Sequence, residues 1–216
     1  MTQNELKKMA ALEALKFIKD GDIVGIGSGS TVFYFIEALA NSGIKIQGAV
    51  TASVYSEDRL RNFGIKVIDP NTIESIDYYF DGADEIDPNH NMIKGGGAAL
   101  TGEKIIASIA KKFVCLVDET KLVDVLGAFP VPIEVIPKSS SYVIRELQKL
   151  GAKPVIRECL ITEYGNLIID TLNLPYIDKE MEIKLNSITG VVMNGIFSVN
   201  KADIVIKALA SGIEIS

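Results

Sequence analysis

Residues 81–103 hold the side chains best suited to chemistry in this chain. Here DGADEID is followed at once by PNHNMIKGGGAALTGEK, so Asp81, Asp84, Lys94 and Glu103 share one strand–loop–helix passage with a triple glycine. Carboxylates, a lysine and bare backbone amides beside a strand end are what proton chemistry on a small, oxygen-rich molecule requires. An acidic loop that only faces solvent is less expected directly after so apolar a strand.

The pair Asp81 and Asp84 is open to three interpretations. At the carboxyl end of a parallel strand, where open sheets bind ligands, the carboxylates can hold or protonate sugar hydroxyls. The acidic loop can also attract a hard cation, although it lacks the EF-hand spacing and Lys94 would compete with the cation. A solvated turn is the third interpretation, and the local sequence does not choose among them.

Lys94 stands directly before Gly95, Gly96 and Gly97. Consecutive glycines cost backbone entropy, so a folded chain keeps them where the backbone is strained or bare. A lysine in such a loop can stabilise a developing oxyanion, and the alternative is a flexible hinge. Glu103 falls in the first turn of a predicted helix, where the helix dipole alone favours an acid; its neighbours make it a candidate base.

A second candidate site is the turn GIGSGST, which lies between a predicted strand and a predicted helix. Glycines let a ligand approach the backbone, and a helix N-terminus offers N–H groups to an anion. Ser28, Ser30 and Thr31 add hydroxyl donors around Gly29. The dinucleotide pattern GxGxxG and the P-loop lysine are both missing. The turn is therefore either a phosphate-binding turn without a nucleotide signature or an ordinary tight turn.

Strands and helices are predicted to alternate along the first part of the chain. It opens with an amphipathic helix that has Leu6, Met9, Leu12 and Leu15 on one face. The alternation that follows indicates a parallel sheet with helices on both faces. The expected strands are 22–27, 44–53, 66–70, 75–87 and 114–118, and the expected helices are 32–43, 54–65 and 101–113.

The pattern changes at the proline-bearing stretch FPVPIEVIPKSS. The following elements read β-α-β-β-α-β, the order of a ferredoxin-like unit, and they are expected at 132–136, 140–151, 153–159, 166–172, 179–190 and 191–199. The predicted fold class is thus α/β, a Rossmann-like parallel-sheet domain plus a smaller ferredoxin-like α+β domain. The predicted Rossmann-like domain covers 1–130 and 201–216, and the smaller domain covers 131–200.

Composition excludes several classes of function. The chain has 216 residues and a net charge of −6, which argues against a broad nucleic-acid footprint. Its two cysteines form no CxxC motif, so neither a disulfide framework nor a zinc site is indicated. No signal peptide or membrane-spanning run is found, and a soluble cytoplasmic protein is expected. With His90 the only histidine, acid–base chemistry must rest on carboxylates and lysines.

Taken together, these segments resemble the A-type ribose-5-phosphate isomerase family. The matching pieces keep the family's order and cover nearly the whole chain: VGIGSGST, TASVYSEDRLRNFGI, DGADEID, MIKGGGAALTGEKIIA, VDETKLVDVLGAFPVPIEVIP and GVVMNGIFSVNKADIVI. The resemblance implies interconversion of D-ribose 5-phosphate and D-ribulose 5-phosphate in the non-oxidative pentose phosphate pathway. It implies no metal and no organic cofactor, a small sugar phosphate as the binding partner, no nucleic acid or membrane partner, and a homodimer.

The resemblance also implies roles for individual residues. Glu103 is the expected general base, and Asp81, Asp84 and Lys94 are the other expected catalytic groups. Lys7 and Lys121, which are ordinary surface lysines by local sequence, join the expected substrate-binding set. That set is Lys7, Ser28, Gly29, Ser30, Thr31, Asp81, Gly82, Ala83, Asp84, Lys94, Gly95, Gly96, Gly97 and Lys121. Two departures from the family are a serine at Ser28, where threonine is common, and Ala98, where a further glycine is often found.

Two other classes of function remain as alternatives. A non-catalytic sugar-phosphate sensor on a related fold would bind the same ligand without turnover. Such sensors usually carry a DNA-binding helix-turn-helix, and the first core strand is predicted near residue 23, which leaves no room for one. A coenzyme A transferase-like enzyme would use a glutamate as nucleophile, but the short chain and the DGAD carboxylates argue against it.

Overall fold

The structure is a computed structural model that describes all 216 residues, and it divides into two compact units. The first unit comprises Met1–Ala83, Gly102–Leu122 and Ala202–Ser216, and the second comprises Asp84–Thr101 and Val123–Lys201. The sequence had placed 84–101 and 123–130 in the first domain. Strand pairing explains the difference for the first of these segments, because its two short strands, 85–86 and 92–93, pair with each other, and the second of them also pairs with residues 196–197 of the second unit.

The first unit is built on a six-stranded sheet in the order β13-β12-β6-β3-β1-β2. All neighbouring strands are parallel except the pair β12 and β13. The strands are β1 (Ile23–Ile26), β2 (Gly48–Thr51), β3 (Ile76–Asp81), β6 (Ala110–Asp118), β12 (Ile204–Leu209) and β13 (Gly212–Ile215). The helices are α1 (Gln3–Ala14), α2 (Ser30–Asn41), α3 (Val54–Asn62) and α4 (Leu100–Ile109), of which α4 begins in the second unit.

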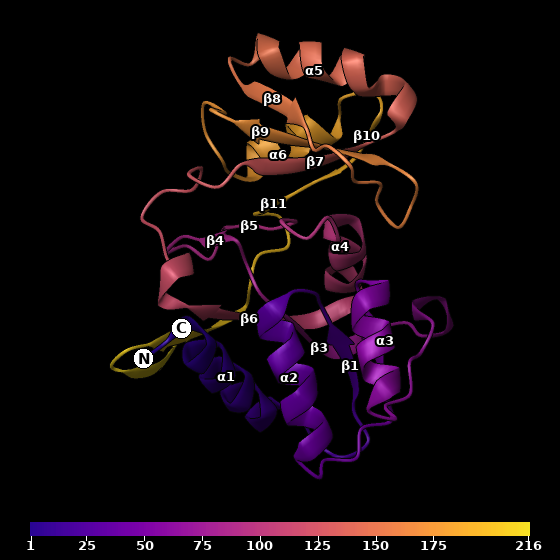
Figure 1. Ribbon diagram of the computed structural model, residues 1–216, viewed down its shortest axis with the longest axis vertical. Coiled ribbons are helices and arrows are strands. Elements are labelled where there is room, and N and C mark those ends of the chain that lie inside the picture. The colour runs from indigo at the N-terminus through magenta and orange to yellow at the C-terminus, as the bar shows by residue number, and fades with distance from the viewer. The chain divides into compact units, whose positions relative to one another are not determined.

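Helices α1 and α2 lie side by side and pack against the sheet of the first unit (Figure 1). The predicted apolar face of α1 is wrong at one position, since Leu12 is 59 % exposed. The buried face consists of Leu6 and three alanines instead, at Ala10, Ala11 and Ala14. Small side chains let a helix approach its neighbours closely, which explains why most of the buried residues of α1 are alanines.

Several expected elements differ from the structure, and three of the differences have a clear structural description. Residues 66–70 form no strand beyond one isolated bridge between Ala49 and Val67. The helix predicted to 113 ends at Ile109, because Ala110 onward pairs with β3 and tertiary pairing overrides local propensity. The last strand of the smaller domain is broken at Gly195, where an added Cβ would lie 2.2 Å from the carbonyl oxygen of Lys94.

The second unit contains a four-stranded antiparallel sheet in the order β10-β7-β9-β8. Helices α5 and α6 pack on it, in the predicted β-α-β-β-α-β order (Figure 1). A three-stranded sheet, β11-β5-β4, completes the unit. The elements are β4 (Glu85–Ile86), β5 (Met92–Ile93), β7 (Val131–Val135), α5 (Ser140–Lys149), β8 (Lys153–Ile156), β9 (Leu167–Leu172), α6 (Lys179–Asn186), β10 (Val191–Asn194) and β11 (Ile196–Phe197).

The predicted α/β fold class is therefore confirmed, with its parallel sheet in the first unit and its α+β arrangement in the second. None of the helices combines the length and the apolar character that crossing a lipid bilayer requires.

Candidate active site

The turn after β1 is shaped by a carboxylate that ends β3. Asp81 is fully buried, and a Cβ added to Gly27 would lie 1.9 Å from its carboxyl carbon. Only glycine therefore fits at position 27. Gly29 has a different requirement, because its φ of 91° lies in the left-handed region that glycine tolerates. The glycines of the GIGSGST turn thus admit Asp81 and start α2.

Asp81 is held by donors on both sides of the turn. Its Oδ1 accepts the backbone N–H of Ser28 at 3.0 Å and that of Gly82 at 2.8 Å. Its other oxygen accepts a short hydrogen bond from the hydroxyl of Tyr79. Burial, together with the nearby carboxylates of Asp81 and Glu103, raises the pKa of Tyr79 well above its usual value, so this hydroxyl keeps its proton and donates it.

Glu103 is brought to the same turn by α4. Its side chain is 3 % exposed, and it accepts a 2.6 Å hydrogen bond from the hydroxyl of Ser28. Gly102 allows this approach, because a Cβ there would lie 2.1 Å from the carbonyl oxygen of Ala52. Ser28 thus joins two buried carboxylates, donating its amide to Asp81 and its hydroxyl to Glu103. The helix dipole alone explains an exposed glutamate, not one buried in this way.

Two residues that sequence reasoning left out support the turn. Ser56, buried in the first half of α3, donates its hydroxyl to the carbonyl oxygen of Gly27 at 2.6 Å. Tyr79 lies two residues before Asp81 on β3, so the two side chains point to the same face of the sheet. That alternation was a signal for Tyr79 in the sequence, whereas nothing local indicated Ser56.

A lysine meets the beginning of α2 at the other end of the turn. Lys7 Nζ donates to the hydroxyl of Ser30 at 3.0 Å, and Thr31 is the next residue of the helix. An ammonium beside the positive end of a helix dipole is unfavourable unless an anion accompanies it. The structure therefore joins two predicted substrate-binding residues in a group suited to a phosphate.

Lys121 lies beyond the end of β6, in the short 3-10 turn Glu119–Lys121. Gln3 of α1 donates to the hydroxyl of Thr120 at 3.1 Å, and residues four apart on a helix share a face. Gln3 and Lys7 are such a pair, so the face of α1 that carries Lys7 is anchored next to Lys121.

The second unit carries the remaining predicted residues. Lys94 follows β5, is 3 % exposed, and donates its backbone N–H to the carbonyl oxygen of Gly195 at 2.9 Å. Its Nζ lies 5.4 Å from the centre of the Phe197 ring, within the range of a cation–π contact. The Asp84 carboxylate accepts the N–H of Gly96 at 2.8 Å. The Gly96 amide is therefore already engaged by the protein, unlike the bare amides expected from the sequence.

The predicted site residues thus form two groups, one in each unit. The first unit gathers its members at the carboxyl edge of the parallel sheet, namely Lys7, Ser28, Gly29, Ser30, Thr31, Asp81, Gly82, Ala83, Glu103 and Lys121. The second unit holds Asp84, Lys94, Gly95, Gly96 and Gly97. Among all 216 residues, no three or more His, Cys, Asp or Glu side chains are grouped so that they could hold a metal ion. Independence of metal stays a prediction.

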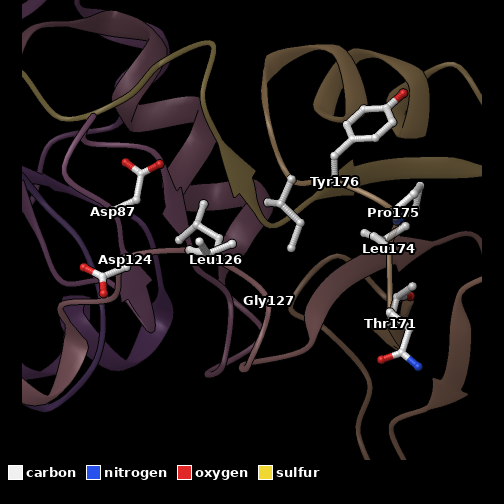
Figure 2. Close-up of a pocket in the computed structure, with 11 residues that line it drawn as sticks. Asp87, Asp124, Leu126, Gly127, Thr171, Leu174, Pro175 and Tyr176 are labelled. Atoms are coloured by element: carbon white, nitrogen blue, oxygen red, sulfur yellow. The ribbon is translucent and has the colours of Figure 1, made fainter.

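A cavity of about 500 Å³ in the second unit is separate from this chemistry (Figure 2). Figure 2 shows Asp87 and Asp124 at one end and Leu174 and Tyr176 at the other. None of the predicted site residues lines it. The lining residues are Asp87, Asp124, Val125, Leu126, Gly127, Thr171, Asn173, Leu174, Pro175, Tyr176 and Ile177.

Comparison with known proteins gives a consistent result. The sequence profile of the family ribose 5-phosphate isomerase A (phosphoriboisomerase A) matches residues 48–212. Ribose 5-phosphate isomerase A from Neisseria gonorrhoeae is 44 % identical, with a TM-score of 0.97 over 99 % of this chain and 96 % of that chain. The enzyme from Methanocaldococcus jannaschii is 38 % identical, with a TM-score of 0.93 over 100 % and 99 % of the two chains.

A third solved structure is that of a D-ribose-5-phosphate isomerase in complex with phospho-erythronic acid. It is 45 % identical to this chain, with a TM-score of 0.95 over 100 % of this chain and 99 % of the other.

Proposed function

Because the chain belongs to the ribose 5-phosphate isomerase A family, it is an isomerase of ribose 5-phosphate, and we propose that it works through an enediolate. The observation that carries this mechanism is the pair of buried carboxylates, Asp81 and Glu103, joined by Ser28. A relative whose structure was solved in complex with phospho-erythronic acid adds support, since the planar carboxylate of that acid resembles an enediolate. The product of the reaction is ribulose 5-phosphate.

Glu103 is the general base in this proposal. It removes the proton from C2 of the open-chain aldose and returns it to C1. A positioned base contributes about 10²- to 10⁴-fold in rate, which is not sufficient for so weak a carbon acid. The 2.6 Å hydrogen bond from Ser28, in the turn after β1, fixes one oxygen of Glu103 and limits how far the carboxylate can move.

Lys94 stabilises the negative oxygen of the enediolate. A donor aimed at a developing oxyanion in a site with little water contributes roughly 3–4 kcal/mol, which adds to the contribution of the base. Support comes from its burial, because the charge of a lysine residue that is only 3 % exposed is poorly hydrated and interacts strongly with a nearby negative charge. Asp81 and Asp84 move protons among the sugar oxygens and assist ring opening.

The phosphate is bound by Lys7, Ser30 and Thr31, with Lys121 on the sugar or the phosphate. The supporting contact is the 3.0 Å hydrogen bond between Lys7 and Ser30 at the first residue of α2. Since the phosphate does not react, its binding energy serves to orient C1 and C2 against the base.

A direct test is incubation of the protein with ribose 5-phosphate in D2O, followed by NMR. We expect ribulose 5-phosphate to form with deuterium on the carbon that exchanges its proton. Folded protein that binds the sugar phosphate without converting it would favour a sensor, and activity that depends on coenzyme A would favour a transferase. We expect undiminished conversion after exhaustive chelation, whereas dependence on a metal would restore the metal interpretation of the acidic loop.

We also propose a cytoplasmic homodimer. Both cysteines, Cys115 and Cys159, are free thiols, which fits a reducing compartment. The dimer is supported by the family resemblance, and light scattering of the purified protein tests it. A mass equal to that of one chain at micromolar concentration would refute the dimer.

A further inference from the structure

We propose that Arg157 is a positioning residue for the isomerisation. It fixes the two peptide groups between Gly95 and Gly97, and it thereby leaves the N–H of Gly97 as the open backbone donor for the enediolate. This inference rests on the proposed role of the Lys94 loop. It concerns only residues of the second unit.

Arg157 uses both edges of its guanidinium. Nε and Nη2 donate to the two carboxylate oxygens of Asp170 on β9, at 2.8 Å and 2.6 Å. The other edge faces the glycine loop, where Nη1 donates to the carbonyl oxygens of Gly96 at 2.9 Å and Gly95 at 3.3 Å. The Arg157 and Asp170 side chains are only 18 % and 24 % exposed. Such a bidentate, largely buried pair is a fixed support, because the carboxylate sets the plane of the guanidinium.

Because the peptide bond is planar, a hydrogen bond that fixes a carbonyl also fixes the direction of the N–H on the same peptide. In a trans peptide the C=O and the N–H point in opposite directions. The Gly95–Gly96 peptide is held at both ends, by Arg157 and the backbone N–H of Ala98 on its carbonyl and by Asp84 on its N–H at 2.8 Å. The Gly96–Gly97 peptide is held by Arg157 on its carbonyl only.

The N–H of Gly97 therefore points away from Arg157. It makes no hydrogen bond within the protein, and Gly97 is exposed. Gly97 is three residues from Lys94, the proposed electrophile. The direction of the Gly97 N–H is set by Arg157, which binds the Gly96 carbonyl and does not contact the N–H itself. Hydrogen bonding of the Gly96 carbonyl to a cation also polarises that peptide and makes its N–H a stronger donor.

The loop needs such a support because glycine has little conformational preference of its own. Gly95 has φ of 99°, and no side chain on Gly96 or Gly97 anchors the backbone. A flip of the Gly96–Gly97 peptide would replace the N–H by a carbonyl oxygen, which would repel a developing oxyanion. Arg157 disfavours that flip because it would break the 2.9 Å hydrogen bond.

The competing explanation is that Arg157 only joins β8 to β9 through Asp170. The variant Arg157→Lys separates this explanation from the proposal, because a lysine keeps the charge but cannot bind Asp170 and two carbonyls in one plane. We expect kcat to fall about 10- to 100-fold, as for a small misplacement of a catalytic group, with KM changed by less than about threefold. The matched control is Arg145→Lys on α5, an exposed arginine, which should leave both constants unchanged.

Chemical rescue gives a readout that a purely structural role would not move. In Arg157→Ala, ethylguanidinium at non-denaturing concentration should restore part of kcat, whereas Lys94→Ala should not respond to it. A kcat of Arg157→Lys within threefold of the wild type would overturn the proposal. So would a loss that only follows the folded fraction and is not rescued.

Hydrogen exchange separates this inference from the proposed function. In Arg157→Lys, the Gly96 amide, which is bound to Asp84 in the wild type, should exchange at least several-fold faster, while core amides of β7 keep their protection. Unchanged Gly96 exchange would refute the support by Arg157 whether or not the protein is active. Lack of isomerisation by the wild type would instead refute the proposed function.

Discussion

The two units position their candidate catalytic residues in different ways. In the first unit, Asp81 ends a strand that is paired on both sides, and Glu103 sits in a helix held close to the end of β2. In the second unit, Lys94 follows a strand of two residues, and the glycine loop is fixed by the side chains of Asp84 and Arg157. Strand pairing positions the first group, whereas the second combines two backbone hydrogen bonds, from Lys94 to Gly195 and from Ala98 to Gly95, with side-chain hydrogen bonds to the glycine loop.

This difference has a consequence for robustness. Moving Asp81 would require breaking ladder hydrogen bonds of the central sheet, which no single surface substitution does. The Lys94 loop can be displaced by loss of one arginine or one carboxylate. Glu103 and the phosphate-binding residues thus belong to the rigid framework. The Lys94 loop depends on a few hydrogen bonds that a single substitution can remove. The following experiments test that contrast, beginning with the largest effect.

Glu103→Gln should cause the largest loss of activity. The amide keeps the size of the side chain and can still accept from Ser28, but it cannot take a carbon proton. We expect kcat to fall by about 10²- to 10⁴-fold with little change in the free energy of unfolding. Steady-state kinetics and urea unfolding measure the two quantities, with Glu57→Gln, at a partly exposed glutamate that pairs with Arg61, as control. Near-wild-type turnover of Glu103→Gln would remove Glu103 as the base.

Lys94→Met should follow, with a fall in kcat of about 10²- to 10³-fold. Methionine preserves the apolar stem beside Phe197 and removes the charge that stabilises the enediolate. Exchange of the C2 proton with solvent, measured by NMR, should fall together with turnover, because both pass through the enediolate. Lys112→Met, in a solvent-exposed ion pair with Asp203, is the control. A change in KM alone would assign Lys94 to ground-state binding.

Removal of the phosphate contact should have a smaller effect. Lys7→Ala deletes the ammonium that donates to Ser30, and a hydrogen bond to a charged group contributes about 1.5–3 kcal/mol. We therefore expect kcat/KM for ribose 5-phosphate to fall roughly 10- to 100-fold. Ribose without its phosphate should react equally slowly with the wild type and the variant. An equal loss with both sugars would mean that Lys7 acts on the reacting end.

The same contrast decides which parts were predictable from the sequence. Asp81, Glu103 and the α2 start follow strands and helices whose apolar patterns are local, and parallel strands bring their carboxyl ends to one edge. The site of the first unit could therefore be predicted, and Tyr79 could have been added from its spacing to Asp81. Lys94 was identified by its glycines, although the engagement of the Gly96 amide was not.

Arg157 could not have been found in this way. It is 61 residues from Gly96 along the chain, and their contact depends on the pairing of β8 with β9 and on the rotamer of a long side chain. The same limit explains the break of the last strand at Gly195, which follows from the approach of Lys94 and not from any local pattern. Long-range side-chain contacts have no periodic signature in one sequence.

Tyr79→Phe tests, through the free energy of unfolding, how firmly Asp81 is held in the first unit. Loss of the hydroxyl leaves one buried oxygen of Asp81 with one donor fewer, which should lower the free energy of unfolding by about 1–3 kcal/mol at pH 7. Because burial raises the pKa of Tyr79 in the folded state, its contribution is complete below pH 10 and is lost as pH rises above 10, where the unfolded chain releases the proton first.

The wild type should therefore lose up to about 1.4 kcal/mol per pH unit from this group above pH 10, and the difference from Tyr79→Phe should shrink. Urea unfolding at pH 8, 10 and 11 measures it, and Tyr142→Phe, at a 41 % exposed tyrosine, is the control. A difference that stays constant through this range would mean that the folded-state pKa is not raised.

Ala98→Gly should give the smallest effect, and with the opposite sign. Ala98 has φ of 63°, and a left-handed alanine costs roughly 1–2 kcal/mol, partly offset by the greater freedom of glycine in the unfolded chain. We expect the free energy of unfolding to rise by up to about 1 kcal/mol. Ala38→Gly, within α2 of the first unit, should lower it by roughly 0.5–1 kcal/mol.

The two alanines thus compare a strained loop with a relaxed framework in one denaturation series. If the strain at Ala98 helps to hold the glycine loop against Arg157, then Ala98→Gly should be more stable but should exchange its Gly96 amide faster. A destabilised Ala98→Gly would show that the loop does not adopt the left-handed conformation in solution. The geometry of the glycine loop would then depend on Asp84 and Arg157, and the strain at Ala98 would not contribute to it.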